Sequence, residues 1–175
     1  MKKYSKILLT AVIIISLFGT LMIYSSSYVW AEYKFNDPYK YIKSQGLFLI
    51  VGYIALFIIS KISYLEYKKK SNIIFIICTV LLSLVLIPGI GTVRNGSRSW
   101  FGIGSFGIQP SEFTKLGLII FTSKYLSNNQ KEIKNIKKEV LPILGVLLLV
   151  FGLIMLEPDF GTGVVIVMTI IVLLF

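Results

Sequence analysis

Six long apolar segments constrain the fold of this chain more than any other feature of its sequence. They cover residues 7–24, 44–60, 71–87, 109–126, 140–156 and 160–175. A helix of about 20 residues crosses the hydrocarbon core of a bilayer, and a backbone surrounded by lipid must satisfy its own hydrogen bonds. The sequence therefore predicts an all-α integral membrane protein, a polytopic bundle with about six transmembrane helices. We expect a single transmembrane domain over residues 1–175.

The composition agrees with a membrane protein and excludes several classes of function. Hydrophobic residues make up 55% of the chain and charged residues only 15%. The net charge of +10 comes largely from lysines in short clusters between apolar segments, which is typical of membrane topology. We therefore expect no nucleic-acid partner. The absence of histidine excludes imidazole acid–base chemistry, and the sequence predicts no metal site.

The basic residues predict the orientation of the chain, because cytoplasmic loops of membrane proteins are enriched in Lys and Arg. With the N-terminus inside, 12 lysines are cytoplasmic: Lys2, Lys3, Lys6, Lys61, Lys68, Lys69, Lys70, Lys124, Lys131, Lys134, Lys137 and Lys138. Five basic residues are then outside: Lys34, Lys40, Lys43, Arg94 and Arg98. We therefore expect a multi-pass protein with a cytoplasmic N-terminus and an extracellular loop at 88–108.

The loop at 88–108 is rich in glycine and leads directly into an apolar helix. That helix opens with Gln109-Pro110-Ser111-Glu112, and Pro followed by an acidic residue is typical of a helix start. Lys115 lies three residues after Glu112, on the same helical face. An ammonium in an apolar segment needs a partner and marks a functional candidate. We expect a Glu112–Lys115 ion pair in or beside a site, with simple stabilisation of the helix start as the alternative role of Glu112.

A second acidic turn, Glu157-Pro158-Asp159, precedes the last apolar segment. In the predicted topology, both of these helices start on the outer side. Their positive ends, together with Arg94, Arg98 and Lys43, predict a site for an anion such as a phosphate or pyrophosphate. The alternative is that Arg98 and Lys43 only extend towards lipid headgroups. Trp100 either packs against a sugar ring or an acyl chain, or anchors the loop at the membrane interface.

Three motifs in this order resemble the SEDS family (shape, elongation, division and sporulation), whose members include FtsW, RodA and SpoVE. The motifs are Arg94-Asn95-Gly96-Ser97-Arg98-Ser99-Trp100, Gln109-Pro110-Ser111-Glu112-Phe113-Thr114-Lys115-Leu116 and Pro158-Asp159-Phe160-Gly161-Thr162-Gly163. The first is most similar to the division and sporulation branch. The resemblance spans nearly the whole chain and implies about ten transmembrane helices, of which this chain has the first six. We therefore expect the N-terminal part of a longer protein.

The resemblance implies a peptidoglycan glycosyltransferase that polymerises lipid II at the outer face of the bacterial cytoplasmic membrane. The glycan moves from its undecaprenyl pyrophosphate to a sugar hydroxyl of a second lipid II. By motif, Glu112, Lys115 and Asp159 are candidates that support the catalytic site. The resemblance implies that the general base is a carboxylate of a later extracellular loop that is not in this chain, so we expect the chain alone to be inactive. The substrate-binding candidates are Lys43, Arg94, Arg98, Trp100, Gln109, Ser111 and Thr162.

The expected partners are lipid II, membrane lipids and a class B penicillin-binding transpeptidase. The sequence indicates no definite cofactor, and a divalent cation at the pyrophosphate is left open. A lipid II flippase and a non-catalytic scaffold for a transpeptidase are the alternative functions. The family's usual Gln and Leu are replaced by Glu157 and Phe160. We expect Glu157 to add negative charge near the pyrophosphate.

Overall fold

The computed structural model describes residues 2–94, 96–102, 107–129 and 136–174, with side chains from residue 5 and, after the last gap, from residue 140. Helices dominate these residues, as predicted, and a short β-hairpin is the exception. The elements are α1 (Lys2–Phe35), α2 (Lys40–Ser60), α3 (Tyr64–Val85), β1 (Thr92–Arg94), β2 (Ser97–Trp100), α4 (Pro110–Asn128), α5 (Ile136–Leu156) and α6 (Phe160–Leu174). The chain forms two compact units, Met1–Ile62 and Ser63–Phe175, and each is described by itself.

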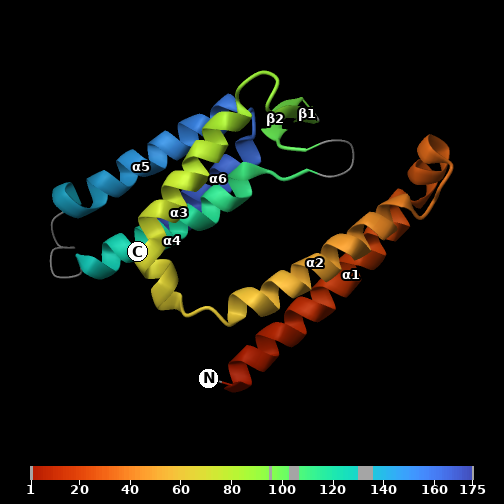
Figure 1. Ribbon diagram of the computed structural model, residues 1–175, viewed down its shortest axis with the longest axis horizontal. Coiled ribbons are helices and arrows are strands. Elements are labelled where there is room, and N and C mark those ends of the chain that lie inside the picture. The colour runs from red at the N-terminus through yellow and green to blue at the C-terminus, as the bar shows by residue number, and fades with distance from the viewer. Residues whose placement is uncertain (1, 95, 103–106, 130–135, 175) are drawn as a thin grey trace. The chain divides into compact units, whose positions relative to one another are not determined.

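The first unit is a pair of long helices, α1 and α2, that lie side by side (Figure 1). The Ser16 and Tyr53 hydroxyl oxygens are 2.5 Å apart between them. Ser5–Phe35 and Lys40–Ser60 are both long and apolar enough to cross a membrane. The 34 residues of α1 span about 51 Å, well beyond the roughly 30 Å hydrocarbon core. We therefore expect α1 to extend past the membrane surface.

Helix α1 runs to Phe35, farther than the predicted end at residue 24. The serines that follow residue 24 do not stop it, because their hydroxyls bond to the helix itself. Ser26 and Ser27 donate to the carbonyl oxygen of Ile23 over 3.3 and 2.7 Å. The helix ends before Asn36, which has a left-handed backbone with φ of +54°. The polar segment after residue 24 is therefore largely helical rather than a loop.

Helix α3 begins at Tyr64, seven residues earlier than predicted. Ser63 caps it, because its hydroxyl accepts a hydrogen bond from the Leu65 N–H over 3.4 Å. Glu66 stands three residues after the cap, which is the Ser-x-x-Glu pattern of a helix start. The lysines at 68–70 therefore lie on a helix rather than in a loop. Lys131 and Lys134 of the next predicted basic loop lie outside the described residues.

The second unit packs α3 to α6 around one apolar core, with β1 and β2 at one end (Figure 1). Val140–Leu156 and Phe160–Leu174 are apolar but shorter than a full membrane span. Six transmembrane helices therefore remain a prediction. The core residues are Leu82, Leu118, Ile143, Leu147, Val150, Ile154, Ile166 and Ile170.

Helices α3 and α4 pack closely because small and flat side chains meet between them. The Thr114 hydroxyl donates to the carbonyl oxygen of Cys78 over 3.1 Å. A Cβ at Gly117 would lie 3.3 Å from the Cys78 sulfur, so a larger residue would separate the helices. The rings of Phe75 and Phe121 stack with centroids 4.9 Å apart. These contacts fix α4 against α3 along most of its length.

The loop at 88–108 contains the β-hairpin, which corrects the purely α-helical prediction. Strands β1 and β2 are antiparallel, with Arg94 opposite Ser97. Gly96 in the turn has φ of +84°, a conformation that glycine adopts at no steric cost. Phe101 and Ile108 then exchange two main-chain hydrogen bonds of 2.8 and 2.7 Å. This second pairing brings the chain directly to the start of α4.

Candidate functional site

The starts of α4 and α6 are joined by their side chains. Gln109, the N-cap residue of α4, donates from Nε2 to Oδ2 of Asp159 over 2.6 Å. Asp159 also caps α6, since its Oδ1 accepts from the Thr162 N–H over 3.1 Å and its Oδ2 from the Thr162 hydroxyl over 2.7 Å. The Asp159 carboxylate therefore holds two helix N-termini together, and each N-terminus carries partial positive charge.

The hairpin is attached to the same place through β2. The Ser97 hydroxyl donates to the main-chain carbonyl of Glu157 in the turn before α6. The Ser99 hydroxyl oxygen lies 2.8 Å from that of Ser97 and is buried. The segments that carry the three sequence motifs are therefore assembled at one end of the second unit. We call this assembly the paired helix starts; it comprises β1, β2 and the first turns of α4 and α6.

Two arginines belong to the hairpin of the paired helix starts. The Arg94 guanidinium carbon lies 5.1 Å from the centre of the Trp100 ring, which is a cation–π contact. A Cβ at Gly107 would lie 2.7 Å from the same guanidinium, so this glycine makes room for Arg94. The Nε of Arg98 is buried without a hydrogen-bond partner in the described part of the chain. An oxygen from a ligand or a water molecule would satisfy this donor.

Glu112 and Lys115 form the predicted ion pair one turn into α4. Nζ of Lys115 lies 3.0 and 2.9 Å from the two carboxylate oxygens of Glu112. The Lys115 side chain is 23% exposed and that of Glu112 is 52% exposed. Phe113 and Leu116 are exposed as well. The pair therefore lies on a side of α4 that the described helices leave open, where a further segment or a ligand can reach it.

Ser111 and Thr114 lie on the covered side of the same helix. Ser111 is fully buried, and its hydroxyl has no hydrogen-bond partner among the residues that the structure describes. Thr114 is equally buried and bonds back to the Pro110 carbonyl oxygen over 3.0 Å. Ser111 therefore reaches a ligand only through a change in packing. Its role in substrate binding stays a prediction.

Glu157 does not add the negative charge that the sequence suggested. Its side chain is fully buried, and neither carboxylate oxygen has a hydrogen-bond partner in the described residues. Burial, followed by the nearby charge of Asp159, raises the pKa of Glu157 to about 8. The carboxyl group is therefore mostly protonated at pH 7. The sequence did not indicate the contact of Ser97 with Glu157 or the bond of Gln109 to Asp159, because 60 and 50 positions separate the partners.

Lys43 belongs to the first unit and has a partner there. Its ammonium forms an ion pair of 2.9 Å with Oδ2 of Asp37. The hydrogen bond from Lys43 lowers the pKa of Asp37 below its ordinary value, with further help from the Tyr39 N–H. Both side chains are well exposed, so the pair can exchange for another anion at little cost. A role for Lys43 in substrate binding stays a prediction.

Comparisons with known sequences match nearly the whole chain. The family model for FtsW, RodA and SpoVE, described as "Cell cycle protein", matches residues 5–175. Stage V sporulation protein E of Bacillus subtilis (strain 168) is 48% identical over 99% of this chain and 48% of its own length. "Probable peptidoglycan glycosyltransferase FtsW" of Trichlorobacter lovleyi is 33% identical over 99% of this chain and 45% of its own length. The chain thus spans about half the length of these curated relatives.

Comparisons with solved structures agree on the fold. Rod shape determining protein RodA of Thermus thermophilus superposes with a TM-score of 0.65 at 29% identity, covering 86% of this chain and 48% of that one. A chain from a structure entitled "Structural coordination of polymerization and crosslinking by a peptidoglycan synthase complex" also gives a TM-score of 0.65, at 28% identity over 87% of this chain and 44% of that one. The helical arrangement is therefore that of RodA-like membrane proteins.

Proposed function

Because the chain belongs to the FtsW/RodA/SpoVE family of cell cycle proteins, we propose that it forms part of a peptidoglycan glycosyltransferase. The complete enzyme would polymerise lipid II at the outer face of the bacterial cytoplasmic membrane. Relatives named "Probable peptidoglycan glycosyltransferase FtsW" support this reaction. The chain would supply one wall of the substrate site, and the general base would come from a later part of the protein.

The observation that carries the proposal is the assembly of the paired helix starts next to the Glu112–Lys115 pair. Gln109 and Asp159 hold two positive helix ends together, and Arg98 retains a buried donor without a partner in the described part of the chain. This concentration of positive charge suits a pyrophosphate, which leaves lipid II as the glycosidic bond forms. Asp159 would position these groups rather than act as a base, because its carboxylate already accepts three hydrogen bonds.

Glu112 and Lys115 would act on the open side of α4. The Lys115 ammonium can donate to a phosphate or sugar oxygen, since an ammonium has three donors. Glu112 would keep Lys115 oriented and would hold its charge in an apolar region. Trp100 and Arg94 would lie against the sugar or the pyrophosphate at the hairpin. Thr162 would contribute indirectly, because its hydroxyl donates to Asp159.

We propose six membrane spans with the N-terminus in the cytoplasm and the paired helix starts outside. The distribution of lysines in the sequence supports this orientation. Two helices have the length and composition of a span, and the shorter apolar helices α5 and α6 would cross where the bilayer thins locally around them. The paired helix starts would then meet lipid II in the outer leaflet, where its sugars are.

We propose that the enzyme works in division or sporulation beside a class B penicillin-binding transpeptidase. The 48% identity to a stage V sporulation protein supports the sporulation branch. The structure entitled as a peptidoglycan synthase complex supports a partner of this kind. A divalent cation would draw its ligands mainly from the pyrophosphate, because no three acidic or thiol side chains gather as a metal site within the described ranges.

The experiment uses a chimera in which this chain replaces the matching half of the Bacillus subtilis relative. The chimera is purified in detergent with its transpeptidase partner and is given lipid II. We expect glycan strands, and we expect none from the 175-residue chain alone. A flippase only moves lipid II across a bilayer and a scaffold only recruits a partner, so neither function forms glycan in detergent. A folded chimera that makes no glycan while the unaltered relative does would therefore contradict the proposal.

A further inference from the structure

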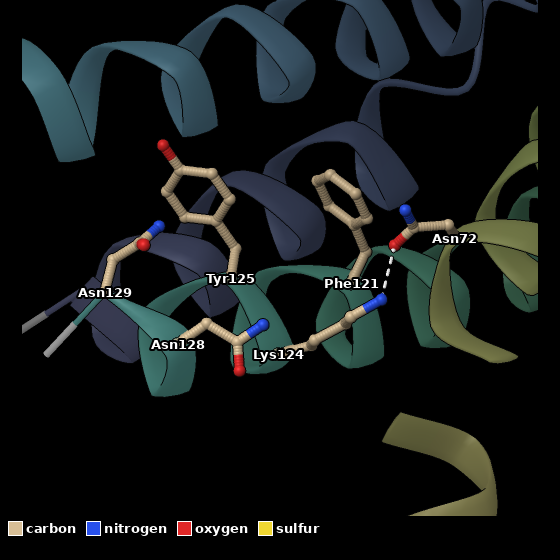
Figure 2. Close-up of a pocket in the computed structure, with 6 residues that line it drawn as sticks. All are labelled: Asn72, Phe121, Lys124, Tyr125, Asn128 and Asn129. Atoms are coloured by element: carbon tan, nitrogen blue, oxygen red, sulfur yellow. Dashed lines mark hydrogen bonds between the residues drawn. The ribbon is translucent and has the colours of Figure 1, made fainter. Parts of the chain in front are cut away.

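A second polar site lies far from the paired helix starts, towards the other ends of α3 and α4. It is a pocket of about 300 Å³ lined by Asn72, Phe121, Lys124, Tyr125, Asn128 and Asn129 (Figure 2). Asn72 comes from α3, and the other residues come from α4 or directly follow it. We call it the amide pocket because three of its six residues are asparagines. Its volume is at the lower end of the range for small-molecule sites.

The amide pocket is a consequence of helix periodicity and of the α3–α4 contact. Phe121, Lys124, Tyr125 and Asn128 follow the spacing of one helical face. Phe121 is fixed by its stacking on Phe75 of α3. The Lys124 ammonium donates to Oδ1 of Asn72 over 3.0 Å (Figure 2). The aromatic rings thus form an apolar wall beside one ammonium and three carboxamides.

Among the described residues, the segment of α3 beside the amide pocket is positively charged. The Lys68 ammonium donates to the Ser127 hydroxyl over 2.9 Å, one residue before Asn128. Lys69 and Lys70 follow on α3, and Glu66 is the only acidic residue between Ser63 and Asn72. A simpler role for Lys124 would be to stabilise the partly negative C-terminal end of α4. The last turn of α4, however, contains no basic residue, and the ammonium is directed to α3 instead.

We propose that the amide pocket binds a phosphate group, from a phospholipid headgroup or from solution. An ammonium that keeps two N–H donors after its bond to Asn72, together with carboxamide N–H groups, matches the oxygens of a phosphate. The aromatic wall would pack against the glycerol part of a lipid. Basic pockets between helices at the cytoplasmic surface are suited to anionic headgroups. This proposal does not depend on the glycosyltransferase reaction.

The test measures phosphatidylglycerol retained by the 175-residue chain in detergent, with native mass spectrometry as the readout. We expect preferential retention over phosphatidylcholine, which carries the same phosphate but also a choline cation that the lysines around the pocket would repel. We expect an affinity for phosphatidylglycerol about tenfold lower in Lys124→Gln, which corresponds to about 1.4 kcal/mol. Lys69→Gln is the matched control, because it removes an exposed lysine of the same basic region outside the pocket. Equal retention in the chain, Lys124→Gln and Lys69→Gln would overturn the proposal.

Two further arms separate the sources of phosphate and guard against misfolding. Inorganic phosphate that competes with the lipid, or binds alone with the same dependence on Lys124, would assign the pocket to a free phosphate. Phosphatidylglycerol retained in excess phosphate would assign it to the lipid. Asn128→Ala changes an exposed side chain and is expected to fold. A severalfold loss of binding in Asn128→Ala supports the pocket. If Asn128→Ala, Lys124→Arg and Lys124→Gln all bind phosphatidylglycerol and inorganic phosphate as the unaltered chain does, the proposal is contradicted.

Discussion

The Gln109 side chain donates to the Asp159 carboxylate over 2.6 Å and so joins the first residues of two helices that are 50 positions apart. Each partner stands at the cap position of its helix, so the bond sets the distance between two partly positive helix ends. The hairpin joins them through Ser97 and the Glu157 carbonyl. The geometry of the proposed anion site thus depends on contacts among three separate segments.

A double-mutant cycle between Gln109→Ala and Asp159→Ala tests this junction. We expect a coupling of about 1.5–3 kcal/mol in the free energy of unfolding, because hydrogen bonds to charged groups are worth about that much. Asp159→Ala alone should cost more than Gln109→Ala, since it also removes the cap of α6. The free energies are measured by titration with dodecyl sulfate in mixed micelles. Asn128→Ala, at the far end of α4, serves as the control. Strictly additive effects of Gln109→Ala and Asp159→Ala on the free energy of unfolding would show that the hydrogen bond between them contributes no stability.

The sequence predicts the parts of the site that depend on local interactions. The Gln-Pro-Ser-Glu pattern marks the start of α4 within one residue, because Pro at the first helical position is a local preference. The Glu112–Lys115 pair follows from a spacing of three on a helix. The sequence also contains a signal for the start of α3, since Ser63 and Glu66 form a capping pattern. The run of lysines that follows led to the interpretation as a loop instead.

The remaining parts of the site depend on contacts that no local pattern contains. Asn95-Gly96 is a strong hairpin signal, but the attachment of that hairpin to Glu157 joins residues 60 positions apart. The burial of Glu157 follows from packing against other segments, and a glutamate after an apolar run normally suggests an exposed turn. Helix α1 continues beyond the apolar segment because Ser26 and Ser27 bond to the carbonyl oxygen of Ile23, and the fall in hydrophobicity after residue 24 does not indicate this.

Glu157 makes the stability of the second unit depend on pH. Its pKa is about 4.5 in an unfolded chain and about 8 in the folded one, so the folded state holds the proton more tightly. This stabilisation is complete below about pH 4.5 and is lost as the pH rises to 8, by at most roughly 1.4 kcal/mol per pH unit. Glu157→Gln, which cannot ionise, should remove this dependence and should stabilise the chain most at pH 8.5. Unfolding titrations at pH 5.5, 7 and 8.5 measure the difference.

Glu66→Gln is the control for this pH series, because Glu66 is an exposed glutamate in the first turn of α3. Its substitution should leave the pH dependence of stability as it is. A Glu157→Gln chain whose stability falls between pH 5.5 and 8.5 as steeply as that of the unaltered chain would show that Glu157 is ionised throughout. The pH dependence would then have another origin.

Gly91 allows the hairpin to lie against the end of α3. A Cβ at this position would be 1.9 Å from the main-chain oxygen of Val85, and a backbone atom cannot move aside as a side chain can. We expect Gly91→Ala to cost about 1–3 kcal/mol of stability and to release the hairpin, which limited proteolysis after Arg94 and Arg98 would detect. Gly145→Ala on α5 has no atom within 4 Å of the added carbon and should be neutral or slightly stabilising. Equal resistance of both variants to trypsin would contradict this role of Gly91.

Glu112 and Lys115 are proposed to serve the lipid II site and not merely to stabilise α4. The most direct measurement is glycan synthesis by the detergent-purified chimera that carries the exchanged pair, Glu112→Lys with Lys115→Glu. Exchange restores an ion pair on the same face, so we expect the free energy of unfolding to stay within about 1 kcal/mol of the original. If the pair serves the site, glycan synthesis falls at least about a hundredfold although the stability is kept. Full synthesis by the exchanged pair would contradict the account and would leave Glu112 and Lys115 a purely structural role.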